Sequence, residues 1–331
     1  MVIHPRITSN LIKVLYTYFT VRAILKVVNV DGLMRRVGGF IEILRVHNLF
    51  VSAMATLLGF ESVYVIVGRD VAFNPVVLTL STVVVVLIAA GGYVINDYYD
   101  AEIDLINKPS RPIPSGRVSR TEALTLSLLL IFLGVVISSY IGVISFMYAV
   151  FNATLLILYS KRLKKEGFAG NLAISTASAN SIIYGGLTLS EVCSDLTLVK
   201  YTLIPATYAF VFTLMREIIK GIEDVTGDLR VGVKTLAITR GVKQASKISI
   251  ILMLLIVLFS PYPYISGVYG TTYLILVLIT DVLLIYSALK LGRTTAESDI
   301  IKASSALRSY TKVAMFLGIT AFLVDLIVRL F

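Results

Sequence analysis

Three aspartates follow an apolar stretch of the sequence at intervals of three and four residues. They are Asp97, Asp100 and Asp104, and Asn96 stands directly before the first of them. On a helix these intervals place the three carboxylates within a stripe of roughly 60°. Such crowding of like charges destabilises a helix, and carboxylate oxygens are the ligands that hard divalent metals prefer. The stretch therefore predicts a helix end that binds a metal cation.

A second acidic pair, Asp224 and Asp228, follows a later apolar stretch. Arg216 and Lys220 precede it at the same four-residue interval, so two bases and two acids share one slowly drifting face of a helix. Alone, this pattern also fits a solvated helix end with ordinary ion pairs. In the first cluster, however, Lys108 is the only base within helical reach, and it reaches a single aspartate. Two such clusters suit a polyanionic substrate, and we expect magnesium bridging to a diphosphate.

The composition places both clusters in a membrane protein. Hydrophobic residues make up 57% of the 331 residues, charged residues only 15%, and the mean hydropathy is +0.87. Apolar blocks of about 20 residues, enough to cross roughly 30 Å of hydrocarbon as a helix, recur along the chain. We therefore expect an all-α polytopic membrane protein. Its nine transmembrane helices are predicted near residues 39–60, 75–96, 122–141, 143–160, 168–190, 199–221, 246–262, 268–289 and 310–331.

Basic residues gather in alternate loops. They follow the second, fourth, sixth and eighth predicted spans, whereas the other connections hold only Arg69 and Lys200. The positive-inside rule then puts the N-terminus inside, the C-terminus outside and both acidic clusters on the cytoplasmic side of the cell membrane. The same distribution excludes a nucleic-acid surface despite the formal charge of +10, because the bases do not line one soluble face.

The first 38 residues differ from the rest of the chain. Basic residues interrupt every apolar run there, and Leu11–Val28 is typical of a basic amphipathic helix that lies on an anionic membrane surface. A poorly ordered extension is the equal alternative. We therefore divide the chain into an N-terminal extension, 1–38, and an intramembrane domain, 39–331.

The apolar surroundings restrict which class of substrate can bind. A diphosphate enclosed by apolar helices implies a lipidic tail, because a water-soluble nucleotide would gain nothing from so much hydrocarbon. The sequence contains no Walker-type phosphate loop, HExxH motif, cysteine pair or GxSxG elbow that would indicate another reaction centre. These observations predict a polyprenyl diphosphate as the substrate.

Both aspartate motifs, their order and the four predicted helices between them resemble the UbiA-type intramembrane prenyltransferases. The intervening stretch LYSKRLKK adds to the likeness, since Tyr159 with Lys164, or with Lys161, matches the tyrosine-plus-basic element of that family. The resemblance covers residues 39–331. It implies nine helices around a central cavity, two magnesium ions that hold the diphosphate between the motifs, and capture of an allylic carbocation by an acceptor.

Four further stretches are similar to the archaeal ether-lipid branch of the family. They are RVHN from Arg45, NKPSRPIPSGRVS, the run from Tyr159 to Asn171, and REIIKGIEDVTGD followed by KTLA. This similarity implies transfer of a geranylgeranyl group from geranylgeranyl diphosphate to geranylgeranylglyceryl phosphate, with release of diphosphate. The implied partners are a polyprenyl diphosphate, a lipidic phosphate acceptor and membrane lipid, whereas the sequence leaves the oligomeric state open.

The resemblance and the spacing together give each polar residue an expected role. The magnesium ligands, which are also catalytic, are Asp97, Asp100, Asp104, Asp224 and Asp228. Asn96 assists them, and the bases that neutralise the diphosphate are Lys108, Arg111, Arg216 and Lys220. The residues expected to contact the acceptor phosphate are Arg45 with Lys161 or Lys164, and Asn48 is a further substrate-binding candidate. Tyr159, with Tyr98 or Tyr99 as further candidates, is expected to shield the carbocation with its ring. A packing role in the core or at the membrane interface is the equal alternative for these tyrosines.

Two alternatives have different chemistry. The first is an aromatic-acceptor prenyltransferase that makes a quinone precursor. The second is an ion-coupled transporter, since Asn152, Asn171, Asn180 and Asp281 lie within predicted spans. Transporter sites gather near the membrane midplane at broken helices, whereas the charged clusters here lie at the ends of spans. The sequence therefore favours the enzyme.

Overall fold

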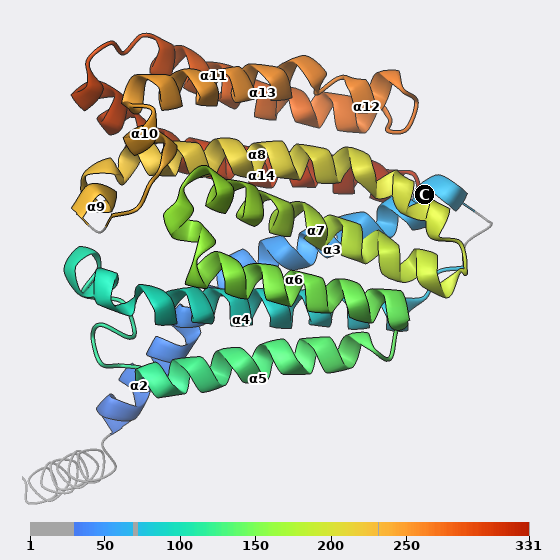
Figure 1. Cartoon of the computed structure of the whole chain (residues 1–331). Coiled ribbons are helices and arrows are strands. Elements are labelled where there is room, and N and C mark those ends of the chain that lie inside the picture. Colours follow the sequence, from blue (N-terminus) through green and yellow to red (C-terminus); the bar gives the residue numbers. More distant parts are fainter. Residues whose placement is uncertain (1–29, 69–71, 231, 331) are drawn as a thin grey trace, which may run out of the picture.

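The computed structural model describes residues 30–68, 72–230 and 232–330 of the chain. Throughout this part the regular structure is helical and no strand occurs, so the all-α prediction is confirmed. Long helices run side by side, as Figure 1 shows. They are α3 (Val46–Val67), α4 (Pro75–Asn107), α5 (Arg120–Ser138), α6 (Val143–Lys161), α7 (Phe168–Val192), α8 (Leu203–Glu223), α11 (Val242–Phe259), α13 (Thr271–Gly292) and α14 (Glu297–Val328).

Eight stretches of the described chain are long and apolar enough to cross a membrane, and they coincide with eight of the nine predicted spans. The ninth prediction, 168–190, corresponds to α7, which has 25 residues. Helix α7 is not among the eight, and polar residues such as Asn171 and Asn180 lower its hydropathy. It packs against both α3 and α8, so neighbouring helices cover much of its surface.

The first and last predicted spans have the wrong bounds. Helix α2 (Val30–Leu44) runs past position 38 without a break, so the predicted boundary between extension and domain falls inside a helix. The helix is then interrupted at Arg45, whose φ of 54° and ψ of 54° are left-handed, and the chain continues as α3. At the other end α14 begins at Glu297 rather than near residue 310. The predicted amphipathic helix Leu11–Val28 lies outside the described residues.

Local sequence explains where the helix that carries the first aspartate motif begins and ends. The side chain of Asn74 accepts a hydrogen bond of 3.1 Å from the backbone N–H of Val77, and Pro75 occupies the first turn, where no backbone donor is needed. Helix α4 then continues to Asn107 and stops before a loop rich in proline and glycine. Its 33 residues therefore carry the motif well beyond the predicted end of the span at 96.

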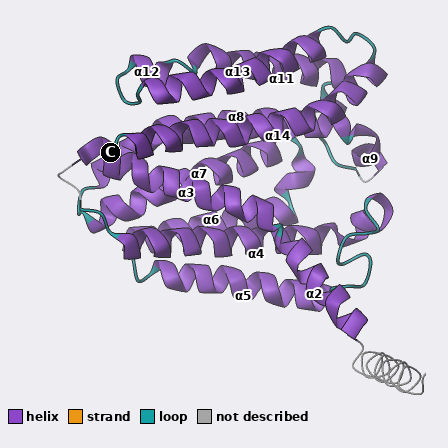
Figure 2. Cartoon of the chain, turned by 180° about the vertical axis from the view of Figure 1, so that it is seen from behind, coloured by secondary structure: helices purple, strands orange, loops and turns teal. Residues whose placement is uncertain are grey.

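Figures 1 and 2 show that the loop after α4 lies at the same end of the bundle as the short helix α9 (Val225–Arg230). Helix α2 projects from this end too, while α12 (Tyr262–Ile265) lies at the other. The two acidic motifs therefore lie at one end of the bundle. This arrangement agrees with the prediction that both follow spans ending on the same side of the membrane. The remaining short helices are η2 (Leu163–Glu166), η3 (Leu196–Thr202) and α10 (Leu236–Thr239).

Glycines allow α3 and α7 to pack closely at the centre of the bundle. A Cβ atom at Gly59 would lie 1.7 Å from the carbonyl oxygen of Ile182, and one at Gly185 would lie 2.0 Å from that of Thr56. Because both obstacles are backbone atoms, no side-chain rotation relieves them. The helix contact that holds α7 against α3 therefore depends on these two positions.

Gly59→Ala is expected to lower the free energy of unfolding by about 1–3 kcal/mol, since α3 and α7 must separate to admit the methyl group. The thermal midpoint of the purified protein in detergent measures this effect. Gly318→Ala is the matched control, because a Cβ there would meet nothing closer than Thr280 Cγ2 at 3.9 Å. A midpoint for Gly59→Ala equal to that of the control would contradict the close packing.

Two acids away from the motifs, Glu191 and Asp325, have structural partners. Glu191 accepts hydrogen bonds of 2.8 Å from the backbone N–H groups of Ile144 and Ser145, and so caps the start of α6. Asp325 accepts from the N–H groups at the start of α13 and pairs with Arg329 at 3.1 Å. These contacts satisfy charges that would otherwise be costly among apolar helices.

Candidate functional site

A cavity of about 1,560 Å³ lies inside the helix bundle. Residues of α3, α4, α6, α7, α8, α13 and α14 line it. Aspartates of both motifs line one region, whereas valines, isoleucines and aromatic rings line much of the rest. The volume exceeds the roughly 300–1,000 Å³ of ordinary small-molecule sites. A long apolar ligand with a charged head is the kind of molecule that this lining suits.

The aspartates of the first motif are buried although they are charged. Asp97, Asp100 and Asp104 are only 5%, 7% and 4% exposed, and all three belong to α4 and line the cavity. The helical stripe predicted from their spacing is therefore present. Burying carboxylates in this way is tolerated only when basic or hydrogen-bonding partners compensate them.

Basic side chains from three separate segments neutralise the first motif, and two of these segments adjoin α3 and α4. Arg45 pairs with Asp97 from the break between α2 and α3, and the loop after α4 brings Arg111 to Asp104 and within 3.4 Å of Asp97. The guanidinium of Arg45 also lies 5.4 Å from the ring centre of Tyr93. The left-handed backbone at Arg45 thus serves to place a cation on a buried acid.

The tyrosine-plus-basic stretch reaches the same motif. Lys164 pairs with Asp100 and lies 3.4 Å from the amide oxygen of Asn96, while the Asn96 amide donates to Asp100 at 2.9 Å. Tyr159, in α6, lines the cavity, and so does Lys161, which is exposed at the C-terminal end of that helix. Of the two lysines considered from the sequence, Lys164 is the one that contacts the first motif.

The second motif occupies the junction of two helices. Asp224 caps the C-terminus of α8, and Asp228 lies in α9, so the four-residue stripe does not continue on a single helix as predicted. Both carboxylates line the cavity. Burial and the charge of Asp224 raise the pKa of Asp228 to about 6. Lys108 lines the same end, and burial and the charge of Arg111 lower its pKa.

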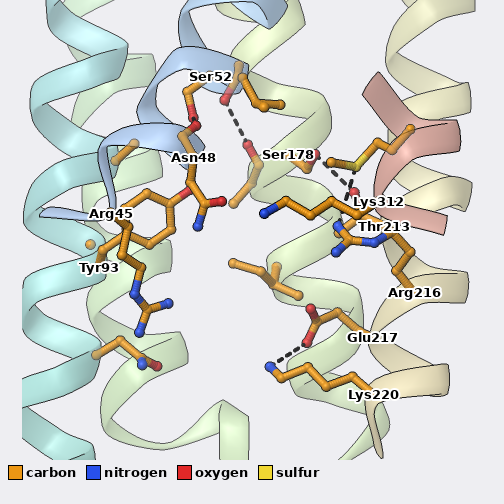
Figure 3. A pocket seen from close by; sticks show the side chains of 18 of the residues that line it. Arg45, Asn48, Ser52, Tyr93, Ser178, Thr213, Arg216, Glu217, Lys220 and Lys312 are labelled. Carbon is orange, nitrogen blue, oxygen red and sulfur yellow. Dashed lines mark hydrogen bonds and ion pairs between the residues drawn. The ribbon is translucent and has the colours of Figure 1, made fainter. Parts of the chain in front are cut away.

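The two predicted bases of α8 have different surroundings. Lys220 lies 3.4 Å from Glu217, one turn before the second motif. Arg216 lies a turn further from the motif, and a terminal nitrogen of its guanidinium is 3.5 Å from the sulfur of Met315 in α14. Figure 3 shows Arg216 close to Lys312, on the side of the cavity formed by α8 and α14. Arg216 therefore lies two turns before Asp224 and beside α14, and its expected role at the diphosphate stays a prediction.

The carboxylates fit a hard divalent metal in their chemistry. Five of them line one cavity, and oxygen is the donor that magnesium prefers. In the described part of the chain, however, no three acidic, histidine or cysteine side chains are gathered closely enough to hold a metal ion. The aspartates of the first motif face basic side chains instead. A metal would therefore exchange places with these bases.

Several residues that line the cavity were not predicted as site residues from the sequence. Glu217, Lys312, Tyr93 and Thr213 all line the cavity, and Figure 3 shows them around it together with Asn48. A charged residue within or beside a predicted span is a signal for function in a membrane protein, and that signal marks Glu217 and Lys312. No comparable signal distinguishes Tyr93 or Thr213 from ordinary packing residues.

Three of the four polar residues that suggested transport form side-chain hydrogen bonds, namely Asn152, Asn180 and Asp281. The hydroxyl of Tyr148 donates to Asn180 at 2.8 Å, and the Asn180 amide donates to Asn152 at 2.7 Å. Asp281 accepts a hydrogen bond of 2.5 Å from Ser260. Asn152 and Asn180 therefore have partners within the bundle, whereas Oδ1 of Asp281 is buried without one.

The chain is similar to known prenyltransferases over most of its length. Residues 53–317 match the sequence model of the UbiA prenyltransferase family. The digeranylgeranylglyceryl phosphate synthase of Hyperthermus butylicus is 44% identical over 298 residues, which cover 88% of this chain and 98% of that protein. That of Sulfurisphaera tokodaii is 42% identical over 277 residues, covering 84% and 94%.

Solved structures agree with these sequence matches. A structure concerning digeranylgeranylglyceryl phosphate synthase in membranes superposes with a TM-score of 0.67 at 32% identity, covering 88% of this chain and 99% of that one. A UbiA homologue from Archaeoglobus fulgidus, bound to GPP and Mg²⁺, shares the fold with a TM-score of 0.56 at 14% identity, covering 84% and 99%. The chain is therefore a member of the UbiA prenyltransferase family, an integral membrane protein and an intramembrane prenyltransferase.

Proposed function

We propose that this enzyme transfers a geranylgeranyl group from geranylgeranyl diphosphate to geranylgeranylglyceryl phosphate in a magnesium-dependent reaction. The observation that carries the proposal is the meeting of two aspartate motifs at one end of a long, largely apolar cavity. The names of the sequence relatives support the glycerol phosphate acceptor. The GPP and Mg²⁺ bound to the A. fulgidus homologue support a prenyl diphosphate and a divalent metal.

The aspartates of the two motifs would hold the metal ions. Bound magnesium would supply positive charge that stabilises the departing diphosphate. The proposed ligands are Asp97, Asp100, Asp104, Asp224 and Asp228, with Asn96 orienting Asp100 through its hydrogen bond. With the aspartates engaged in this way, Arg45, Arg111 and Lys164, which now contact the first motif, would be free to bind phosphate oxygens. Lys108 and Lys220 would add charge at the second motif.

The bond changes are few. The bond between prenyl C1 and the diphosphate oxygen breaks, and its electron pair leaves with the diphosphate. The acceptor hydroxyl oxygen then bonds to C1 and loses its proton to the released diphosphate. The ring of Tyr159, which lines the cavity, would shield the allylic cation through a cation–π interaction of about 0.5–2 kcal/mol.

The reaction would take place on the cytoplasmic side of the cell membrane. The basic loops adjoin the end of the bundle that carries both aspartate motifs, and by the positive-inside rule this end faces the cytoplasm, with the C-terminus outside. The charged heads of both substrates would then enter from the cytoplasm, while their chains lie among the helices.

Purified enzyme with geranylgeranyl diphosphate and geranylgeranylglyceryl phosphate is expected to form the digeranylgeranyl ether and diphosphate, both identified by mass. Excess EDTA is expected to abolish product formation, and added Mg²⁺ to restore it, because the aspartates alone leave the diphosphate charge unneutralised. A parallel reaction with an aromatic carboxylic acid acceptor tests the quinone-precursor alternative. Product from the aromatic acceptor alone, or full activity in EDTA, would contradict the proposal.

A further inference from the structure

Two groups of the cations that line the cavity differ in their partners. Those around the first aspartate motif, Arg45, Arg111 and Lys164, each contact a carboxylate. Lys312 of α14 also lines the cavity, yet within the described ranges no carboxylate lies at ion-pair distance from its amine. Positive charge that faces a cavity without a fixed counterion indicates a binding site for an anion.

Arg216 belongs to the second group. It also lines the cavity, its Nε atom is buried without a hydrogen-bond partner, and the polar contact of its guanidinium is the thioether of Met315 at 3.5 Å. Sulfur is a weak acceptor, so most of the donor capacity of this guanidinium is unused. An unpaired buried donor is costly, which makes a ligand the expected partner.

The two cations approach one region from different helices. Figure 3 shows the side chain of Lys312 extending toward Asn48 of α3, with the guanidinium of Arg216 beside it. Thr213 and Ser178 join the same wall through a hydrogen bond of 3.0 Å between their hydroxyls. The region is therefore a polar recess with two cations and neutral hydrogen-bonding groups.

This recess is separate from the diphosphate end. Arg216 and Asp224 are eight residues apart on α8 and its cap, and at 1.5 Å per residue this separates their backbones by roughly 12 Å. A diphosphate held at the aspartates therefore leaves the recess free. A glycerol phosphate in the recess can still direct its hydroxyl toward the prenyl C1, since only a few covalent bonds separate the phosphate from that hydroxyl.

We infer that Lys312 and Arg216 form the subsite for the phosphate of the glycerol lipid acceptor, an inference that rests on the proposed function. Arginine binds a phosphate through two parallel hydrogen bonds, and lysine adds a mobile point charge. The sequence had suggested Arg45 with Lys161 or Lys164 for this role. Arg45 and Lys164, however, contact the first aspartate motif, where the acceptor phosphate would compete with the diphosphate.

Lys312→Gln tests the subsite with two acceptors, geranylgeranylglyceryl phosphate and its dephosphorylated alcohol. The KM for the phosphorylated acceptor is expected to rise about tenfold, the effect of losing one charge-assisted contact. The KM for the prenyl diphosphate and the activity with the alcohol should match the wild type. Lys302→Gln is the control, because Lys302 is exposed on the same helix and does not line the cavity.

A second variant keeps the charge and removes the paired hydrogen bonds. Arg216→Lys should raise the same KM by several-fold. An equal loss with both acceptors, or a rise in the KM for the prenyl diphosphate instead, would overturn the subsite. Failure of the proposed function has a different signature, since the wild type would then form no product from either glycerol lipid, and this result would overturn the subsite as well.

Discussion

Asp100→Asn is expected to lower kcat/KM for geranylgeranyl diphosphate by about 1,000-fold, as initial rates at saturating Mg²⁺ would measure. Asp100 is buried at the centre of the first motif and contacts both Asn96 and Lys164. Asparagine keeps the size and one carbonyl oxygen, but it removes the negative charge that we propose holds the metal. Losing one group that stabilises charge in the transition state costs about 100- to 1,000-fold, and here a metal site is weakened as well.

Two controls separate chemistry from folding in the Asp100 experiment. Glu102→Gln alters a neighbouring acid of α4 that points away from the cavity, where its side chain is 80% exposed and lies 3.1 Å from Arg120. Exposed ion pairs contribute little, so its activity should equal that of the wild type. The double variant Asp100→Asn/Lys164→Gln removes the base left unpaired by the single change. Recovery of activity in the double variant would mean that Asp100 serves only to neutralise Lys164.

The helices that carry the aspartates follow closely from the sequence. Apolar blocks of membrane-spanning length predict α4 and α8, and the spacing of Asp97, Asp100 and Asp104 predicts their common face because α4 continues beyond the apolar block. These features are local, since they depend on hydropathy and on 3.6 residues per turn. Local patterns therefore predicted the all-α fold and the meeting of the motifs at one end.

The break at Arg45 shows what local patterns miss. No proline or glycine occurs there, yet the residue takes a left-handed backbone conformation and extends its guanidinium to Asp97, which is 52 residues away in sequence. Left-handed conformations are unfavourable for ordinary residues. Contact with a distant, buried charge is the feature of the structure that compensates for it, and a window of neighbouring residues contains no sign of that charge.

That the second group of cations lies together in the cavity could not be predicted, for a similar reason. Lys312 stands near the beginning of a predicted span, where a lysine usually marks only the membrane boundary. Its place in the cavity depends on α14 packing against both α3 and α8. Arg216, by contrast, was singled out by its spacing from Lys220 and Asp224, but spacing alone did not show that its guanidinium faces α14.

Asp224→Asn is also expected to reduce kcat/KM by about 1,000-fold, because we propose that both motifs act on the same diphosphate. The two motifs lie 120 residues apart in sequence and belong to helices that line a single cavity. Asp299→Asn is the matched control, since Asp299 is exposed in the first turn of α14 and does not line the cavity. Its kcat/KM should equal that of the wild type.

The double variant Asp100→Asn/Asp224→Asn distinguishes one shared site from two independent ones. Independent effects multiply, so two separate sites predict a loss of about a millionfold. Residues that act as a unit show a much smaller combined loss of kcat/KM, because the second change removes an interaction that the first has already disabled. We therefore expect the kcat/KM of the double variant to lie no more than about tenfold below that of the less active single variant. A multiplicative loss would mean that the two motifs act independently, and it would contradict the proposal that both bind one metal-bound diphosphate.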